Sequence, residues 1–356
     1  MGNYNYPLLN KVFETYSAIS DLSDTWLVSC QHLLEPQFEM FKRLINFGFK
    51  PANIILLGKA YSANMDVAVE LRQLGIDVRT PEFLGKSFDI EHRENCLDLY
   101  KSFPTDITKV VILDDGGELI KIFSENNRHI SFAVEQTSSG FRKLEGINFN
   151  FPVINVARSA VKLLQESPLV ARLCFERMQK YFQDKELDKP KILVVGLGPI
   201  GEAVLEIFKQ DGLIVDGFDI KYGHSDLISR IREFSPDVVV GATGANIISK
   251  KDLETLVSEQ TIHFISVSSS DREFEVAPFR SNNNIHDDVY YKNFVFINNG
   301  FPITFKGNRY ELTPIEIEKT VCLLGGSVAY GIAEDISTMK GMVDVPQELQ
   351  DLLYKG

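Results

Sequence analysis

Short apolar runs alternate with amphipathic segments along most of the chain. Residues 53–60 (NIILLGKA) form an apolar run, residues 64–75 repeat apolar positions at helical spacing, and the run IDVRT follows. This succession predicts a strand, a helix and a second strand, which together make the βαβ unit of a parallel sheet. Further apolar runs that end in polar loops occur at 109–117, 130–140 and 151–156. The first part of the chain is therefore predicted to form an open parallel sheet.

A second series of apolar runs begins with KPKILVVGLG. Further runs follow at 213–220, 236–244, 261–269 and 293–300, each separated from the next by a helical or looped segment. Strands that alternate with helices in this way are typical of α/β proteins with parallel sheets. We therefore predict an α/β fold with two Rossmann-like, doubly wound parallel-sheet domains and a cleft between them.

Residues 157–190 separate the two series. This segment predicts one long helix or two helices, with Pro168 as the interruption, because a helix interior needs the amide hydrogen that proline lacks. Its polar end, QDKELDKP, is typical of a linker. Further on, Thr313 is predicted as the N-cap of a helix that has Pro314 at its first position and Glu316 as the capping-box partner. That helix could pack back on the first domain.

A glycine motif typical of dinucleotide binding follows the first strand of the second series. Gly196, Gly198 and Gly201 stand between the apolar run KILVV and the helical segment EAVLEIFKQDG. Glycines at this spacing allow a tight turn, the close approach of a pyrophosphate and close packing of helix on strand. Asp219 ends the next strand, where a carboxylate accepts hydrogen bonds from ribose hydroxyls and repels a 2′-phosphate. The motif therefore predicts NAD rather than NADP, although the same glycines could serve a plain strand–turn–helix.

The glycine motif assigns roles to the two predicted domains. We predict a substrate-binding domain at residues 1–160, joined by residues 313–356, and an NAD-binding domain at residues 161–312. The segment GATG (241–244) ends another strand of the second domain, where small residues let the chain approach a cofactor. The predicted cofactor-binding residues of this domain are Gly196, Gly198, Pro199, Ile200, Gly201, Asp219, Thr243 and Gly244.

Composition narrows the class of protein. The net charge of −12 argues against a nucleic-acid partner, since phosphate binding needs a basic surface. No long uncharged apolar run predicts a membrane span, and the first residues lack the basic and apolar regions of a signal peptide. The four cysteines are scattered without CxxC spacing, which predicts reduced thiols and no metal site. We expect a cytoplasmic protein.

Four stretches of the first half have polar endings that a purely structural sheet does not need. They are SCQHLLEP (29–36), ILDDGGEL (112–119), AVEQTSSGF (133–141) and PVINVARSAVKLLQES (152–167). In this order ahead of the glycine motif, they resemble the S-adenosylhomocysteine hydrolase (adenosylhomocysteinase) family over about residues 25–305. The resemblance implies an enzyme in which NAD oxidises the 3′-hydroxyl of a ribose. The resulting ketone permits elimination of a 5′ thioether and addition of water, and is then reduced again.

The resemblance also implies which residues act. Lys162 matches the lysine that assists the oxidation, and Glu166 stands where the family has its partner aspartate. Asp115 matches the active-site aspartate and His32 the histidine near the 5′ end. An ordinary surface ion pair, for Lys162 and Glu166, and a structural role, for His32, are the simpler interpretations. Glu135 and Gln136 stand for a Glu-Glu pair of the family in substrate binding, the second of them being neutral here. Thr137, Ser138 and Ser139 replace three threonines on the cofactor side. Thr304, in a segment that replaces the family's histidine-bearing loop, is also predicted to bind the cofactor.

Departures from the family pattern concern recognition of the purine and the second domain. Leu34 and Pro36 occupy positions whose side chains hold the adenine edge in the family, and neither can form such a hydrogen bond. Ala157 and Arg158 replace an Asn-Asp pair, and Asp271 stands near the family's second-domain histidine. The C-terminal Lys/Tyr tail, which in the family reaches a neighbouring subunit's NAD site, is at most a vestige here.

These observations predict a divergent, NAD-dependent enzyme of adenosylhomocysteinase type. It would oxidise a hydroxyl of a nucleoside, ribosyl thioether or sugar-like small molecule, with hydrolysis or elimination of a leaving group as further steps. Two alternatives stay open: a plain NAD-linked dehydrogenase of a hydroxy or amino acid, and a catalytically inactive NAD-binding regulator. The resemblance implies a homo-oligomer, either a dimer or a tetramer, and we expect no nucleic-acid or membrane partner.

Overall fold

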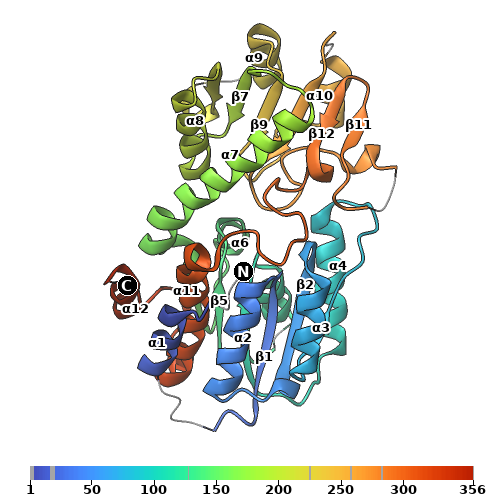
Figure 1. Cartoon of the computed structure of the whole chain (residues 1–356). Coiled ribbons are helices and arrows are strands. Elements are labelled where there is room, and N and C mark those ends of the chain that lie inside the picture. Colours follow the sequence, from blue (N-terminus) through green and yellow to red (C-terminus); the bar gives the residue numbers. More distant parts are fainter. Residues whose placement is uncertain are drawn as a thin grey trace. The chain divides into compact units, whose positions relative to one another are not determined.

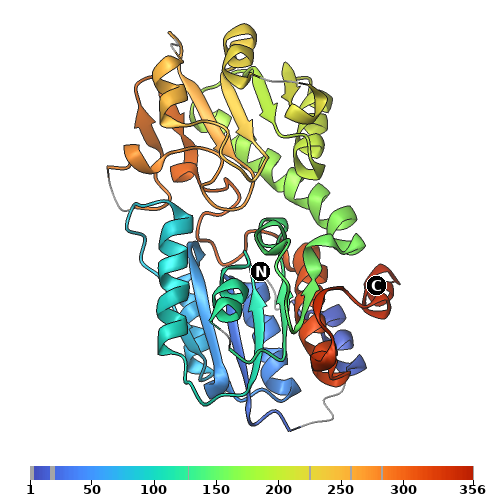
Figure 2. The ribbon, with the colours of Figure 1, turned by 180° about the vertical axis from the view of Figure 1, so that it is seen from behind.

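The computed structural model describes residues 4–16, 21–126, 128–223, 226–256, 259–281 and 284–355. The chain divides into two compact units, and each consists of a sheet with helices on its faces (Figure 1 and Figure 2). Unit 1 comprises Met1–Glu82, His92–Glu166 and Gly307–Gly356; unit 2 comprises Phe83–Glu91 and Ser167–Lys306. The predicted α/β class is confirmed.

Unit 1 contains a seven-stranded sheet in the order β13-β6-β5-β4-β1-β2-β3. Every strand pairs in parallel with its neighbours. The chain order runs outward in both directions from β1 and β4, so the topological switch point lies between these two strands. The strands are β1 (Thr25–Leu33), β2 (Ile54–Ala63), β3 (Asp77–Arg79), β4 (Lys109–Asp114), β5 (Phe132–Glu135), β6 (Pro152–Asn155) and β13 (Gly341–Asp344).

Helices cover both faces of this sheet, which is why its strands read as continuous apolar runs. One face packs against α1 (Pro7–Thr15), α2 (Glu35–Phe47), α3 (Met65–Gln73), α11 (Pro314–Ala333) and α12 (Gln347–Lys355). The other packs against α4 (Phe88–Ser102), α5 (Glu118–Glu125) and α6 (Ser138–Leu144). The short helices of this unit are η1 (Pro51–Asn53), η2 (Val156–Arg158), the π-helix η3 (Lys162–Glu166) and η7 (Ile336–Thr338).

Unit 2 contains a six-stranded sheet in the order β11-β12-β10-β9-β7-β8, with its switch point between β7 and β9. The sequence predicts parallel strands only, but β11 runs antiparallel to β12. The reason is the two-residue connection between Tyr291 and Phe294, which is too short for a parallel crossover. The strands are β7 (Ile192–Val195), β8 (Val215–Phe218), β9 (Val238–Gly241), β10 (Ile262–Ser266), β11 (Val289–Tyr291) and β12 (Phe294–Phe296).

Two pairs of helices cover the faces of the second sheet. One face packs against α7 (Ser167–Asp184) and α8 (Pro199–Gln210), the other against α9 (Leu227–Phe234) and α10 (Lys250–Thr255). The short helices are η4 (Ile220–Tyr222), η5 (Ala277–Phe279) and η6 (Ile297–Gly300).

The predicted helical segment 157–190 contains an irregularity of its own. Pro168 is the second residue of α7, and the π-helix of residues 162–166 directly precedes α7. A proline at position 168 leaves the carbonyl of Leu164 without its usual helical donor, which accounts for the wider turn at this place. The helix therefore changes its hydrogen-bond pattern before the proline.

Candidate functional site

The switch point of unit 1 brings together charged side chains from three strands. His32 lies near the end of β1, Lys59 lies in the second half of β2, and Asp115 directly follows β4. In open α/β sheets, ligands bind beyond the carboxyl ends of the strands at this point. The sequence resemblance named His32 and Asp115, whereas Lys59 was missed because it lies within an apolar run.

Asp115 is the centre of this cluster. One carboxylate oxygen, Oδ1, accepts a hydrogen bond from the ammonium group of Lys59, and the other lies 3.1 Å from Nε2 of His32. The side chains of Asp115 and Lys59 are 1% and 3% exposed, and that of His32 is 12% exposed. On its far side, His32 contacts the hydroxyl of Ser62 through Nδ1. Among these four residues, His32 has the most exposed side chain, so its ring is the group that an incoming molecule can contact.

The electrostatics of the cluster define its charge state. Burial disfavours the ionised form of Asp115, but the charge of Lys59 and the ring of His32 outweigh burial and hold the pKa of Asp115 well below its usual range. Burial likewise opposes the charge of Lys59, and Asp115 more than compensates, so the pKa of Lys59 is raised. For His32 burial dominates and lowers the pKa despite Asp115. At neutral pH the cluster thus holds an ion pair and a neutral imidazole.

Ser62, His32 and Asp115 follow one another as a nucleophile, base and carboxylate would in a hydrolase. Ser62 is fully buried, however, so no substrate carbonyl reaches its hydroxyl in this structure. A neutral His32 with its proton on Nε2, toward Asp115, accepts a hydrogen bond from the Ser62 hydroxyl at Nδ1. Ser62 therefore orients the ring.

Lys162 and Glu166 lie together in the π-helix of unit 1. The Lys162 Nζ atom is 3.1 Å from Oε2 of Glu166, which also accepts a hydrogen bond of 2.8 Å from Thr320 of α11. Both side chains of the pair are largely buried. The charge of Lys162 also contributes to the lowered pKa of His32, after burial and together with Lys59. The structure therefore places Lys162 in the electrostatic environment of His32.

The segment after β5 provides polar groups of two kinds. Glu135 is fully buried and accepts hydrogen bonds from the backbone of Gly116 and Thr137, so it supports the neighbouring turns. Thr137 is the N-cap of α6, and its hydroxyl also contacts that of Ser139. Ser138 is exposed and Gln136 is buried. Of the predicted substrate-binding pair, neither Glu135 nor Gln136 is freely accessible.

The glycine loop of unit 2 connects β7 to α8 with little spare room at two positions. A Cβ atom on Gly201 would lie 1.9 Å from the carbonyl oxygen of Gly196, and Gly196 itself has a φ of +92°. At Gly198 a Cβ atom would meet nothing within 4 Å. Gly198 is also the N-cap of α8, followed by Pro199, and none of the described side chains caps this helix. The open space thus lies at a helix N-terminus, which favours an anion.

Asp219 follows β8 and faces this loop. Its Oδ2 accepts a hydrogen bond of 2.7 Å from the amide of Leu197, and its Oδ1 accepts one of 2.9 Å from that of Lys221. The ammonium group of Lys221 binds the carbonyl oxygen of Leu197 and lies 3.9 Å from Asp219. The carboxylate therefore fixes the loop.

Glu273 organises the other side of the switch point of unit 2. This buried side chain accepts hydrogen bonds from the Thr243 hydroxyl at 2.8 Å, the Gly244 amide at 2.5 Å and the Ser268 hydroxyl at 2.5 Å. Burial raises the pKa of Glu273, opposed by these donors. Glu273 holds the predicted cofactor residues Thr243 and Gly244. No sequence motif indicates this role, because the donors to Glu273 come from other segments. Thr304, the remaining predicted cofactor residue, is buried in the same unit.

Comparison with known proteins gives relatives at the level of sequence. No protein-family model matches the chain. Two Mycobacterium tuberculosis proteins, "Uncharacterized protein MT0113" of strain CDC 1551 / Oshkosh and "Uncharacterized protein Rv0104" of strain ATCC 25618 / H37Rv, are each 30% identical to it over 349 residues. These matches cover 89% of this chain and 67% of each relative. The chain belongs to the family of these two mycobacterial proteins.

Solved structures similar to this family member include one that is named as an NAD-dependent enzyme. The dipicolinate synthase A chain from Bacillus subtilis covers 90% of this chain and 98% of its own length, at 10% identity and a TM-score of 0.36. The match to a glyoxylate reductase from Paecilomyes thermophila covers 86% of this chain and 95% of that enzyme's chain, with 9% sequence identity and a TM-score of 0.39. An NAD-dependent formate dehydrogenase from Staphylococcus aureus, in complex with NAD, covers 69% and 74%, at 12% identity and 0.34.

In this family member, Asp271 takes part in a buried ion pair of unit 2. It accepts a hydrogen bond of 2.6 Å from Arg280, whose side chain is 2% exposed, and further bonds from the amide of Phe88. Arg280 also donates to the carbonyl oxygens of Gly85 and Lys86. These contacts attach residues 83–91 to unit 2. Asp271, which stands near the histidine position of the resembled family, is thus engaged in a structural contact.

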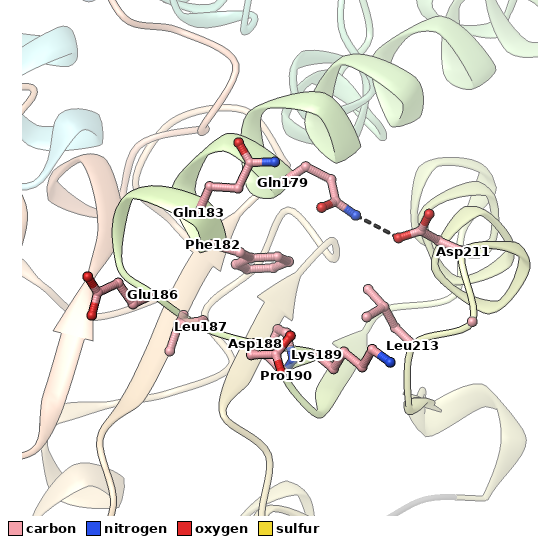
Figure 3. Close-up of a pocket in the computed structure, with 11 residues that line it drawn as sticks. Gln179, Phe182, Gln183, Glu186, Leu187, Asp188, Lys189, Pro190, Asp211 and Leu213 are labelled. Atoms are coloured by element: carbon pink, nitrogen blue, oxygen red, sulfur yellow. Dashed lines mark hydrogen bonds between the residues drawn. The ribbon is translucent and has the colours of Figure 1, made fainter.

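Other features of this family member lie away from the predicted residues. A pocket of about 730 Å³ in unit 2 is lined by α7, the segment before β7 and the turn before β8, including Phe182, Lys189 and Asp211 (Figure 3). It lies at the amino ends of the strands, whereas the glycine loop lies at the carboxyl ends. Among the described residues, no group of histidine, cysteine and acidic side chains could hold a metal ion. Within the same residues, no helix is long and apolar enough to cross a membrane.

Proposed function

We propose that the protein is an NAD-dependent oxidoreductase that oxidises a hydroxyl group of a small polar substrate. Unit 2 would bind the cofactor. The cluster of Lys59, Asp115 and His32 in unit 1 would accept the proton that the substrate hydroxyl loses. The observation that carries the proposal is the presence of a nucleotide-type loop at one switch point and a buried charged cluster at the other.

The residues of unit 2 fit a dinucleotide. The space at Gly198 and the uncapped start of α8 suit a pyrophosphate, because backbone amides and the helix dipole favour negative charge there. Asp219 supplies carboxylate oxygens for the ribose hydroxyls of NAD and would repel the 2′-phosphate of NADP. When bound, NAD supplies an acceptor for hydride from the carbon that bears the substrate hydroxyl.

The residues of unit 1 fit the proton side of such a reaction. When the substrate hydroxyl takes the place of the Ser62 hydroxyl at Nδ1, a neutral His32 can accept its proton, and the adjacent carboxylate of Asp115 stabilises the imidazolium that forms. Lys59 keeps Asp115 ionised and in place. Because its pKa is lowered, His32 stays competent as a base below the usual titration range of histidine. Lys162 adds positive charge that would favour an alkoxide.

A cycle of adenosylhomocysteinase type is the second candidate. It is favoured by the placement of Lys162 within the electrostatic environment of His32, beside Asp115 in the same unit, as the sequence resemblance implies. In such a cycle the substrate ketone is reduced again, so NADH does not accumulate. A plain dehydrogenase releases NADH together with its product. The time course of NADH absorbance therefore separates the two candidates.

The proposal is tested in two steps on the purified protein. Calorimetry should show NAD binding and at least tenfold weaker binding of NADP. A panel of hydroxy acids, sugars, nucleosides and ribosyl thioethers is then monitored for NADH and, by mass spectrometry, for product. His32→Asn should reduce turnover by about 10²–10⁴-fold, the usual contribution of a general base. Binding of neither dinucleotide would refute the proposal, and NAD binding without turnover of any compound would favour a regulator.

A further inference from the structure

Two fully buried carboxyl groups lie side by side next to the charged cluster of unit 1. Asp114 ends β4 and Glu135 ends β5, and the register of these parallel strands pairs the two residues directly. The preceding pair on the same face, Ile112 and Ala133, belongs to one apolar core cluster. Paired residues of adjacent strands project from the same face at a strand spacing of about 4.8 Å. Asp114 and Glu135 therefore continue an apolar layer with two acids.

Each of these carboxyl groups has one satisfied and one unsatisfied oxygen. Glu135 Oε1 accepts from the Gly116 amide at 3.2 Å and from the Thr137 amide and hydroxyl at 2.7 and 2.8 Å. Asp114 Oδ2 accepts from the Ile120 amide at 3.0 Å. Among the described residues, Glu135 Oε2 and Asp114 Oδ1 are buried without a hydrogen-bond partner. An unpaired ionised oxygen in such a place costs several kcal/mol of folding free energy.

Within the part of the chain that the structure describes, the charged groups around the pair leave it without a counter-ion of its own. Lys59 and Lys143 both act on Asp114 from a distance, but Lys59 binds Asp115 and Lys143 binds Glu118 at 2.7 Å. Asp115 adds a second negative charge next to both acids. Burial is the main cause that raises the pKa values of the nearby thiols of Cys30 and Cys96, and the negative charge of Asp114 raises them further.

The titration behaviour of the two acids agrees with this environment. Burial, followed by the charge of Asp114, raises the pKa of Glu135, and burial likewise raises the pKa of Asp114. Two adjacent carboxylates in a water-free site cannot both ionise at little cost, so one of them keeps a proton. A proton between the two unsatisfied oxygens gives each a partner.

We propose that Asp114 and Glu135 share one proton at neutral pH, held between Oδ1 and Oε2, and that this pair fixes the turn that presents Asp115. The remaining oxygens of the pair bind the amides of Gly116 and Ile120, on either side of the turn after Asp115. Gly116 and Gly117 have φ angles of +117° and +72°, which other residues rarely adopt. Asp114 and Glu135 are thus positioning residues for Asp115.

Infrared spectroscopy tests the shared proton without reference to any substrate. The native protein in D₂O at pH 7 should show the carbonyl band of a protonated carboxylic acid. Glu135→Gln should remove this band, because its amide replaces the acid as the donor to Asp114, and Asp114→Asn should remove it as well. Glu318→Gln is the matched control: Glu318 is also buried, but it binds Tyr4 and the amides of α1, and the band should persist.

Absence of the band from the native protein, or its persistence in both variants, would overturn the proposal. If neither variant folds, a carbon-13 titration of the native carboxyl groups decides: one group must stay protonated near neutral pH. Neither measurement depends on catalytic activity. The shared proton can therefore be confirmed or refuted even if the protein oxidises no substrate and the proposed function is wrong.

Stability gives a second, independent readout. A raised pKa means that the folded state binds more protons than the unfolded state between the ordinary and the raised value. The shared proton should therefore contribute stability that is lost as the pH rises from about 5 to about 8, and Glu135→Gln should lack that contribution. The unfolding temperature of the variant, relative to the native protein, should rise over this range. A constant difference would contradict the shared proton.

Discussion

Lys59 illustrates how one side chain decides the chemistry of its neighbours. Its ammonium group is buried beside Asp115, and both charges depend on each other for compensation. The removal of one partner of a buried ion pair leaves an uncompensated charge, which typically costs about 3–5 kcal/mol. The same removal would bring Asp115 closer to its protonated form, in which it no longer stabilises a positive His32.

Lys59→Met is therefore expected to lower the free energy of unfolding by about 3–5 kcal/mol at neutral pH. Because Asp115 would then have a raised pKa, the variant should lose stability as the pH rises and regain it as the pH falls. The double variant Lys59→Met, Asp115→Asn should be less destabilised, since it buries no charge. Urea denaturation of the single and double variants measures this coupling. Additive effects of the two substitutions would show that the pair does not interact.

The sequence pattern could not reveal Lys59 as the partner of Asp115, and the physical reason is distance along the chain. Its partner Asp115 lies 56 positions away, and only the register of β2, β1 and β4 brings them together. The resemblance to family motifs names His32 and Asp115 together, and the structure places them in contact. Periodicity alone assigns each of these residues to a strand and says nothing of its partners.

At the level of elements, the sequence predicts best where apolar periodicity and helix signals coincide. The predicted start of a helix at Thr313 is confirmed, with the Glu316 carboxylate accepting from the Thr313 amide at 3.1 Å and hydroxyl at 2.6 Å. The antiparallel β11 and the C-terminal β13 escape prediction because short, half-exposed strands have weak patterns. The attachment of residues 83–91 to unit 2 also escapes, since it depends on Arg280 and Asp271 far along the chain.

The glycine loop permits a prediction in which two similar substitutions act differently. Gly201→Ala places a methyl group 1.9 Å from a backbone oxygen, so it should destabilise the protein even without cofactor. Gly198→Ala meets no atom within 4 Å and has an ordinary φ of −84°, so the free protein should keep its stability. The added methyl group would nevertheless fill the space proposed for the pyrophosphate.

Thermal denaturation without ligand and calorimetry with NAD distinguish the two effects. Gly201→Ala should lower the unfolding temperature by several degrees, as expected for a loss of about 1–3 kcal/mol. Gly198→Ala should leave that temperature unchanged and weaken NAD binding at least tenfold. Full NAD affinity in Gly198→Ala would exclude this loop as the pyrophosphate site, whatever the stability of the variant.

For the whole molecule, the two switch points suggest that each unit has a separate role, with the proposed NAD binding in unit 2 and the proposed proton transfer in unit 1. Helix α8, Asp219 and Glu273 belong to unit 2, whereas His32, Lys59, Asp115 and Lys162 belong to unit 1. Each unit has its own core clusters on both faces of its sheet. A defect in one set of side chains should therefore leave the function of the other set intact, provided that the chain folds.

These separate roles predict that variants of the two units differ in NAD affinity and in turnover. His32→Asn in unit 1 should bind NAD within about twofold of the native affinity, because the pyrophosphate and ribose contacts proposed above come from unit 2, and a twofold change is only about 0.4 kcal/mol. Its turnover should nevertheless fall, while Gly198→Ala in unit 2 should lose affinity first. Calorimetry with NAD needs no knowledge of the substrate, so it can be done before any activity is found. If His32→Asn weakened NAD binding as strongly as Gly198→Ala, the imidazole would itself belong to the cofactor site, and its assignment as the proton acceptor would be wrong.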